Sequence, residues 1–273
     1  MADPVPVPTL DVLLPPGRGA LPPDPVELAL TALYAHPAPR PGWSTAVRAS
    51  MVTTLDGAAT GADRVSGSIN DAADHRVFAV LRSVADVVLI GAGTARAEGY
   101  RHLSVAPALA PGRAARGQRD RLELAVVTVS GDLPAALLAD DDAPLVITVA
   151  ASPGLAALRD RLGPDRVIEA GTTEIDLPRA LAALAARGLT RVLAEGGPHL
   201  LADLVAAGCV DELCLTTSPQ LVGGSTLRIL ATDDWLDPAR RLHAAHLLHS
   251  GGTLLARWVL DGGHRAPAAR LPG

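Results

Sequence analysis

The amino-acid sequence predicts an α/β fold with a mixed, mostly parallel central sheet and an antiparallel hairpin at its carboxyl end. Between residues 41 and 260, apolar runs of strand length alternate with amphipathic runs of helix length. Several strand-length runs are apolar throughout, which is typical of parallel strands that are buried on both faces. The last two runs meet at Ser250-Gly251-Gly252, a sequence that favours a tight turn between antiparallel strands.

Nine strands are expected from these runs, with amphipathic helices between them. In chain order the strands cover residues 46–52, 86–91, 124–129, 145–150, 166–170, 191–194, 211–217, 241–248 and 253–260. The first helix has apolar residues at i, i+3, i+4 and i+7 from Val77, and Asn70 or Asp71 is placed to cap its start. The second helix begins after Asp176 and ends at Gly188.

The two ends of the chain are expected to lie outside the α/β domain. Residues 1–40 are rich in proline, which blocks regular backbone hydrogen bonding, so they predict an extended arm. A short helix over residues 25–34 is an alternative for part of this arm. Residues 41–260 are expected to form the domain, and residues 261–273 a flexible tail.

Composition excludes several classes of function. The net charge is −5, and all 24 basic side chains are arginine because the chain contains no lysine. Schiff-base chemistry, pyridoxal phosphate and the P-loop each need a lysine, and nucleic-acid binding needs clustered basic side chains. No apolar run reaches membrane-spanning length, no secretory signal is recognisable, and Cys209 and Cys214 form no metal motif. We therefore expect a cytoplasmic protein that binds neither nucleic acid nor a membrane and holds no metal.

A strand-to-helix turn at Gly196-Gly197 is a candidate ligand site. It joins the strand over residues 191–194 to a third expected helix, which begins at Pro198. Two glycines let the backbone come close to a ligand, and the free N–H groups of a helix start favour an anion such as a pyrophosphate. Glu195 ends the strand where ligands of α/β proteins usually bind. A plain tight turn is the alternative interpretation.

A second glycine turn, Gly91-Ala92-Gly93-Thr94, follows the strand over residues 86–91. It begins like a dinucleotide-binding fingerprint, but Arg96 stands where the third glycine is needed, which disfavours a Rossmann dehydrogenase. The Thr94 hydroxyl and the neighbouring amides are expected to contact a phosphate or a ribose.

A long polar loop between residues 50 and 78 leads into the first expected helix. Loops of this length in a compact domain are usually functional. Asp74, in the first helical turn, has two interpretations. It is either a surface acid that stabilises the helix dipole or a carboxylate that pairs with the N–C–NH2 edge of a pyrimidine or pteridine.

Taken in order, these segments resemble the pyrimidine reductase family of riboflavin biosynthesis over about residues 43 to 260. That family has the three-layer α/β/α fold of dihydrofolate reductase. The matching segments are Leu55-Asp56-Gly57, Ser66-Gly67, Leu81-Arg82-x-x-Ala85-Asp86, Ile90-Gly91-Ala92-Gly93-Thr94, Glu195-Gly196-Gly197, Val210-Asp211-Glu212-Leu213, Pro219 and Gly223-Gly224.

The resemblance implies that the chain binds NADPH at the two glycine turns. Thr94 and Glu98 would touch the cofactor, its 2′-phosphate would lie near Thr128 and Ser130, and its adenine beside Ala170. The pyrophosphate and the nicotinamide would lie against the second turn. The residues in this role are Glu195, Gly196, Gly197, Pro198 and His199.

On the substrate side, the resemblance implies that the loop with Asp56 and Ser66 covers the nicotinamide. Asp74 would meet the substrate ring and is the candidate catalytic residue. The resemblance also implies a homodimer. The chain departs from the family over residues 97–102, which lack the usual stretch ending in an arginine for the ribose phosphate, and Ala58 replaces the usual lysine. These departures are on the substrate side of the site, so they leave the identity of the natural substrate open while the reductase chemistry stays the expected one.

The expected activity is NADPH-dependent reduction of a small heterocyclic substrate by hydride transfer to a C=N carbon. A 5-amino-6-ribosylaminouracil phosphate is the substrate that the resemblance favours. Reduction of dihydrofolate, a pterin or another specialised heterocycle is an alternative within the same class. A nucleotide-binding sensor of the same fold is the alternative without turnover.

Overall fold

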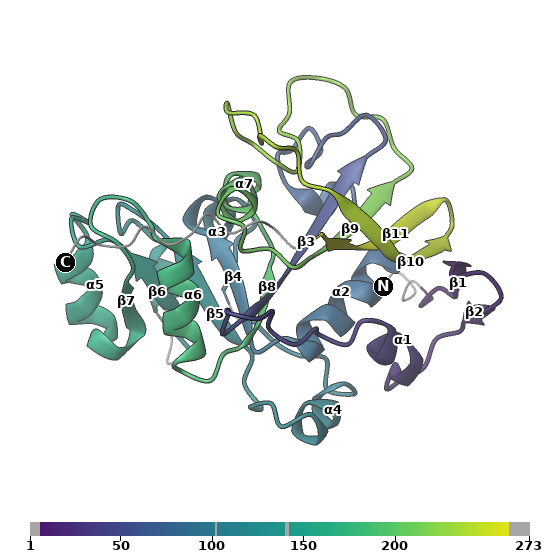
Figure 1. The fold of residues 1–273 in the computed structure, drawn as a ribbon, viewed down its shortest axis with the longest axis horizontal. Helices are drawn as coiled ribbons and strands as arrows, with labels where there is room; N and C mark the ends of the chain where they lie inside the picture. The colour runs from purple at the N-terminus through teal and green to yellow at the C-terminus, as the bar shows by residue number, and fades with distance from the viewer. Residues whose placement is uncertain (1–5, 102, 140–141, 262–273) are drawn as a thin grey trace.

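The computed structural model describes residues 6–101, 103–139 and 142–261, and one eleven-stranded sheet forms its centre (Figure 1). The strands are β1 Leu10–Leu14, β2 Ala20–Leu21, β3 Ala46–Thr54, β4 Val87–Gly91, β5 Glu123–Val127, β6 Leu145–Thr148, β7 Val167–Glu169, β8 Arg191–Ala194, β9 Glu212–Ser218, β10 Leu242–Ser250 and β11 Thr253–Leu260. Their order across the sheet is β2-β1-β10-β11-β9-β3-β8-β4-β5-β6-β7.

The sheet is mixed and mostly parallel, as the sequence predicts. Every pair from β9 to β7 is parallel, whereas β11, β10, β1 and β2 join the other side antiparallel. All nine predicted strands are present, and β10 and β11 form the predicted hairpin.

Among the described residues, seven helices and three short 3-10 turns accompany the strands. The helices are α1 Leu28–Leu33, α2 Ala72–Val84, α3 Ala92–Ala97, α4 Ala110–Ala115, α5 Leu155–Leu162, α6 Leu177–Ala185 and α7 Pro198–Ala206, and the turns are Ser66–Ser68, Ala135–Leu138 and Pro164–Arg166. The three predicted helices are α2, α6 and α7. Sequence analysis does not predict α3, α4 and α5, because six to eight residues are too few for an apolar period to be recognisable.

Helices cover both faces of the parallel part of the sheet, which gives the three predicted layers (Figure 1). On one face, α6 and α7 pack in a core with Val87 and Leu89 of β4. On the other face, α2 and α5 pack in a core with Val88 and Ile90 of the same strand. Successive side chains of a strand point to opposite faces, so a continuously apolar strand supplies both cores.

The proline-rich N-terminal arm is bound to the domain. Its strand β1 pairs with β10, and β2 pairs with β1. The arm also includes α1, which lies inside the region of the alternative short helix. The Arg76 guanidinium of α2 fixes the arm, because it donates to the carbonyls of Pro8, Leu21 and Pro22 and pairs with Glu27. The part of the predicted tail beyond residue 261 lies outside the described residues.

A buried polar cluster lies where the antiparallel strands meet β3. Arg48 is fully buried and donates to Glu212, and Arg257 donates to the other oxygen of the same carboxylate. His246 of β10 is 1% exposed and packs edge-on against Tyr34, with ring centroids 4.5 Å apart. Burial, with the nearby positive charges of Arg257 and Arg48, lowers the pKa of His246 to about 4. The imidazole is therefore neutral in the folded protein at neutral pH.

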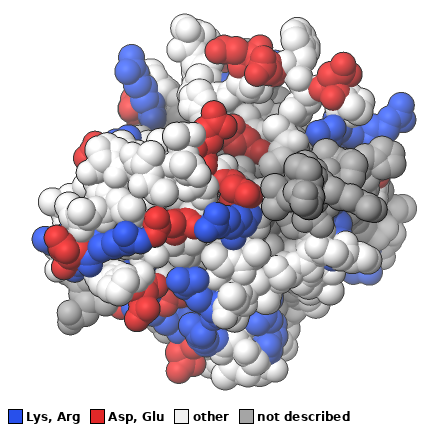
Figure 2. Space-filling view, turned by 60° about the vertical axis from the view of Figure 1, so that its left-hand side comes forward, with Lys and Arg blue, Asp and Glu red and all other residues white. Residues whose placement is uncertain are grey.

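No helix in the described part of the chain combines the length and the apolar character needed to cross a lipid bilayer. Basic and acidic side chains are interspersed over the face drawn in Figure 2. Such mixing leaves short-range ion pairs rather than one broad field of a single sign.

Acidification should destabilise the folded state through His246. The unfolded chain takes up a proton on this imidazole near its usual pKa of about 6.5, whereas the folded state resists protonation until its pKa of about 4. The free energy of unfolding should therefore fall as the pH drops through this window, by about 1–2 kcal/mol between about pH 6.5 and 5.

In urea titrations at several pH values, His246→Gln should reduce this loss of unfolding free energy. The matched change His243→Gln, at an exposed position of the same strand, should leave it unchanged. Identical pH profiles for the three proteins would contradict the assignment.

Candidate active site

Two cavities lie at the edge of the sheet where the parallel strands end. The main cavity, of about 1350 Å³, is lined by the end of β4, by the residues after β8, by α2 and by loop residues 59–67 and 222–227. The side cavity, of about 590 Å³, is lined by residues that follow β5, β6 and β7. Gly93 lines both cavities, so they adjoin at the first glycine turn.

Most of the predicted site residues line these cavities. Those in the main cavity are Ser66, Asp74, Thr94, Glu98, Glu195, Gly197, Pro198 and His199. Those in the side cavity are Thr128 and Ser130. The other predicted residues, Asp56, Ala170 and Gly196, are absent from both linings. The structure thus gathers residues from five separate segments of the chain along one edge of the sheet.

The two glycine turns contact each other directly. The N–H of Gly91 donates to the carbonyl of Gly196 at 3.0 Å. Gly196 has a φ of 91°, which is a left-handed value that favours glycine, and the peptide bond that follows it is cis. A Cβ on Gly197 would lie 2.6 Å from Thr94 Oγ1, closer than packed side chains approach. A larger residue at position 197 would therefore force the Thr94 side chain to move.

The carboxylate of Glu195 is occupied by protein partners. Nε and Nη2 of Arg82 each donate to it at 2.7 Å, and the Tyr100 hydroxyl donates at 2.6 Å. The Glu195 side chain is only 2% exposed, so this is a forked, charge-assisted pair held away from water. Burial opposes the charge on Arg82, but the bonds and the charge of Glu195 outweigh it and raise the Arg82 pKa. Glu195 therefore anchors the second glycine turn to α2.

Asp74 lies in the first turn of α2 and reaches the wall of the main cavity. The hydroxyl of Thr216 on β9 donates to Asp74 Oδ1 at 2.6 Å. Burial raises the pKa of Asp74, and the hydrogen bond from Thr216 opposes that rise. Among the described residues, Oδ2 of Asp74 has no hydrogen-bond partner. One oxygen of a partly buried carboxylate is therefore available to N–H donors of a ligand.

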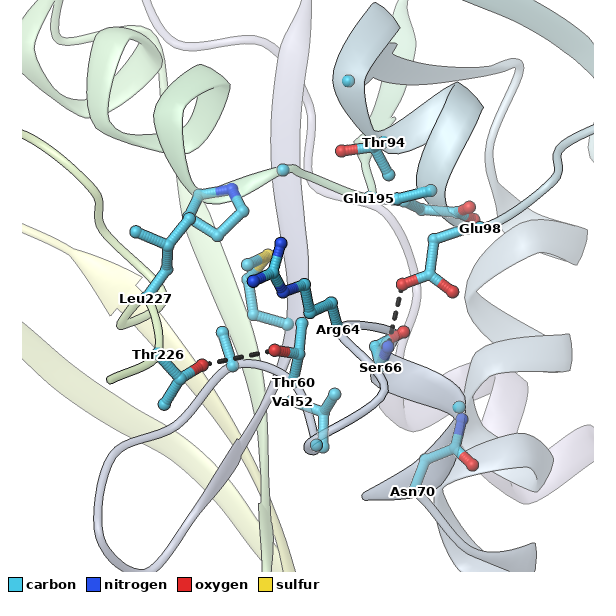
Figure 3. A pocket seen from close by; sticks show the side chains of 18 of the residues that line it. Val52, Thr60, Arg64, Ser66, Asn70, Thr94, Glu98, Glu195, Thr226 and Leu227 are labelled. Atoms are coloured by element: carbon cyan, nitrogen blue, oxygen red, sulfur yellow. Dashed lines mark hydrogen bonds between the residues drawn. The ribbon is translucent and has the colours of Figure 1, made fainter. Parts of the chain in front are cut away.

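Two other predicted contact residues, Glu98 and Asp56, hold the loops around the main cavity. Glu98 Oε1 accepts the N–H of Ser66 at 2.8 Å (Figure 3). Asp56 Oδ2 accepts the N–H groups of Val222 and Gly223 at 3.2 and 2.7 Å. These carboxylates fix the two loops that face each other across the cavity.

The side cavity is shaped by two loops in close contact. Thr128 Oγ1 accepts the N–H of Gly131 at 3.1 Å. A Cβ on Gly131 would lie 2.8 Å from the Cα of Gly154, so the loops after β5 and β6 touch through their backbones. Arg96 also lines this cavity, and its Nη1 donates to the carbonyl of Asp132 at 3.0 Å. The cavity therefore combines hydroxyl groups with a positive charge.

The sequence does not predict the contacts of Arg82, Tyr100 and Thr216, or the place of Arg64 in the lining of the main cavity. Arg82 was matched to a motif, but its partner Glu195 is 113 positions away, and helical spacing cannot identify such a pair. Tyr100 and Thr216 stand in segments whose sequence has no distinctive pattern. A signal was available for Arg64, because it is the one positive charge in the polar loop before α2.

Arg82→Ala should destabilise the fold, because it leaves the Glu195 carboxylate buried without its guanidinium partner. We expect a loss of about 3 kcal/mol in the free energy of unfolding, measured by urea titration. Tyr100→Phe removes one neutral donor and should cost about 1 kcal/mol. Arg18→Ala, at an exposed arginine of the N-terminal arm, is the control and should change little. Equal effects of the Arg82 and Arg18 changes would show that the pair does not anchor the turn.

Comparisons with known proteins identify the family to which this chain belongs. The RibD C-terminal domain family matches residues 45–256. A 2,5-diamino-6-ribosylamino-4(3H)-pyrimidinone 5′-phosphate reductase of Methanothermobacter thermautotrophicus is 30% identical over 218 residues, which cover 77% of this chain and 95% of that protein. A second reductase of the same name, from Archaeoglobus fulgidus, is 25% identical over 176 residues, covering 64% of this chain and 80% of that protein.

Solved structures agree with this match. A pyrimidine reductase-like protein of Corynebacterium diphtheriae superposes with a TM-score of 0.71 at 28% identity, covering 80% of this chain and 92% of that one. RibD of Acinetobacter baumannii shares the fold with a TM-score of 0.60 at 20% identity, covering 80% of this chain and 58% of that one. The family match spans most of the sheet and both glycine turns, and the chain belongs to the RibD C-terminal domain family.

Proposed function

We propose that this protein reduces a ribosylaminopyrimidine 5′-phosphate with NADPH in riboflavin biosynthesis. The single observation that carries the proposal is the pair of adjoining cavities, with Asp74 in the larger one and the glycine turns between them. The names of the two archaeal relatives support the substrate class. The reaction would add a hydride from the nicotinamide to the C=N carbon of the ring-opened ribosylamine and a proton from water to its nitrogen, which leaves a ribityl chain on an N–H group.

The residues present fit a nicotinamide dinucleotide. A Cβ on Gly93 would meet no atom within 4 Å, so the backbone leaves room where the two cavities adjoin. Thr94, Gly197 and Pro198 would hold the nicotinamide and pyrophosphate side in the main cavity. Thr128 and Ser130 would hold the 2′-phosphate of NADPH in the side cavity. When bound, this cofactor supplies the hydride.

Asp74 would position the substrate ring through its carboxylate, with Oδ2 and the second lone pair of Oδ1 as acceptors. A carboxylate that accepts two N–H bonds from the N–C–NH2 edge of a pyrimidine fixes both the distance and the tilt of the ring. Thr216 donates a hydrogen bond to Oδ1, so the carboxylate itself cannot rotate freely. Orientation of the two reacting carbons accounts for most of the rate enhancement available to such a site.

Asp74→Asn should therefore lower turnover by about tenfold to hundredfold while the Kd for NADPH stays within about twofold of wild type. The amide keeps the size of the side chain but removes one acceptor and the charge. Turnover is measured by NADPH absorbance and affinity by fluorescence titration. Asp165→Asn, at an exposed acid beside β7, is the matched control and should match wild type in both. Equal losses of turnover and NADPH affinity would remove Asp74 from the substrate side.

The substrate class is tested by NADPH oxidation with the ribosylaminopyrimidine phosphates and dihydrofolate assayed side by side, each repeated with NADH. We expect turnover with a ribosylaminopyrimidine phosphate and a preference for NADPH. Turnover with dihydrofolate alone would overturn the pyrimidine assignment in favour of a folate or pterin reductase. NADPH binding without oxidation across the panel would favour the nucleotide-binding sensor.

We also propose that the protein forms a homodimer and lies in the cytoplasm. The segment over residues 210–222 is the proposed contact, and β9 occupies its first part inside the sheet. The outward-facing part is therefore the segment that follows β9, where Leu221 is 76% exposed.

A further inference from the structure

Arg64 is held in a backbone conformation that its side chain does not favour. Its φ is 63°, in the left-handed region that glycine adopts without cost. The N–H of Arg64 donates to the carbonyl of Gly61, and the N–H of Gly61 donates to the carbonyl of Val65. The loop thus closes on itself around this residue. A non-glycine residue kept in such a conformation is a reason to look for a function of its side chain.

This loop is attached to the opposite wall of the main cavity. The N–H of Ala59 donates to the carbonyl of Leu227 at 2.9 Å. The hydroxyls of Thr60 and Thr226 lie 3.2 Å apart and share a hydrogen bond (Figure 3). The backbone that carries Arg64 is therefore fixed, and Figure 3 shows its side chain directed into the cavity.

The guanidinium of Arg64 has no hydrogen bond or ion pair among the described residues. The acids of the same cavity each have another partner: Glu195 pairs with Arg82, Oε1 of Glu98 accepts the N–H of Ser66, and Oδ1 of Asp74 accepts the hydroxyl of Thr216. Arg64 is exposed and lines the same cavity as these acids without pairing with any of them, so its fork of N–H donors is open to a ligand that enters from solvent. The ligand that such a fork recognises is a phosphate or a carboxylate.

We propose that Arg64 binds the phosphate group of the substrate. This rests on the proposed function, and it names the residue that selects a phosphorylated over an unphosphorylated substrate. The same segment carries Arg64 and, ten positions later, Asp74, so one stretch of chain would hold the charged end and the ring of one ligand. In the proposed function, the nucleotide phosphates would be held by other groups, at Thr94, Gly197 and the side cavity.

The test compares each substrate with its riboside, from which the phosphate has been removed. Arg64→Gly is the first variant, because glycine suits the left-handed backbone and the protein should fold at least as stably as wild type. We expect the KM for the phosphorylated substrate to rise by about tenfold to hundredfold, as for loss of a charged hydrogen-bonded contact. The KM for the riboside, kcat and the Kd for NADPH should change by less than about twofold. Arg64→Lys should restore part of the discrimination.

Two further arginines serve as comparisons. Arg228→Ala removes an exposed arginine one residue beyond the cavity lining and should leave the preference for phosphate unchanged. Arg101→Ala removes another arginine of the main cavity. Loss of the preference in the Arg101 variant with its retention in Arg64→Gly would overturn the inference. An equal rise in KM for both substrates, or a loss of NADPH affinity instead, would overturn it as well.

A binding measurement separates this inference from the proposed reaction. Ribose 5-phosphate and ribose are titrated into wild type and Arg64→Gly and followed by NMR chemical shifts. We expect wild type to bind ribose 5-phosphate more tightly than ribose, and the variant to lose that difference. Binding of ribose 5-phosphate that is equal in the two proteins would refute the role of Arg64 even if the enzyme turns over. The expected difference would support it even if no substrate in the panel is reduced.

Discussion

The helix α2 is tied to both halves of the sheet, and the geometry of the site depends on this constraint. At its first turn, Asp74 accepts a hydrogen bond from Thr216 on a strand of the antiparallel side. At its last turn, Arg82 pairs with Glu195, which follows a parallel strand. The eight positions from Asp74 to Arg82 span about 12 Å along this rigid helix. The separation between the candidate ring-binding carboxylate and the glycine turns is therefore set by secondary structure rather than by a loop.

Arginine takes over the buried cationic roles in a chain without lysine. Arg113 is fully buried, and its guanidinium donates to the carbonyls of Ser83, Ala85 and Arg119. Arg76 does the same for the N-terminal arm. A guanidinium directs five donors in one plane, so it can satisfy several carbonyl groups at once, whereas an ammonium is a strongly hydrated point charge. Because a guanidinium can bind several acceptors at once, one that faces a cavity without a protein partner is a candidate ligand-binding group.

The elements that were predictable from the sequence are those with a repeating signal. Several strands are apolar on both faces, α2 has a capping residue and an apolar period, α6 has a capping residue and a terminal glycine, and the two glycine turns stand at strand ends. Contacts between distant side chains have no such signal. The residues next to Glu195 in the sequence do not indicate that it pairs with Arg82. Those next to Asp56 do not indicate that it accepts hydrogen bonds from backbone amides 166 and 167 positions away. The docking of a proline-rich arm was equally invisible, because it depends on Arg76 of another element.

The docked arm also determines how copies of this protein can meet. A sheet ends in unpaired backbone groups that readily pair with another chain. Here one outer strand, β2, has two residues and is followed by Pro22 and Pro23, and the other, β7, has three residues. Neither offers a ladder long enough to continue into a neighbour, so self-association has to use side-chain surfaces. A shortened chain that begins after the arm would instead uncover the part of β10 that β1 now pairs with, around Leu247, Leu248 and His249, and would lengthen the exposed strand edge that can pair with a neighbour.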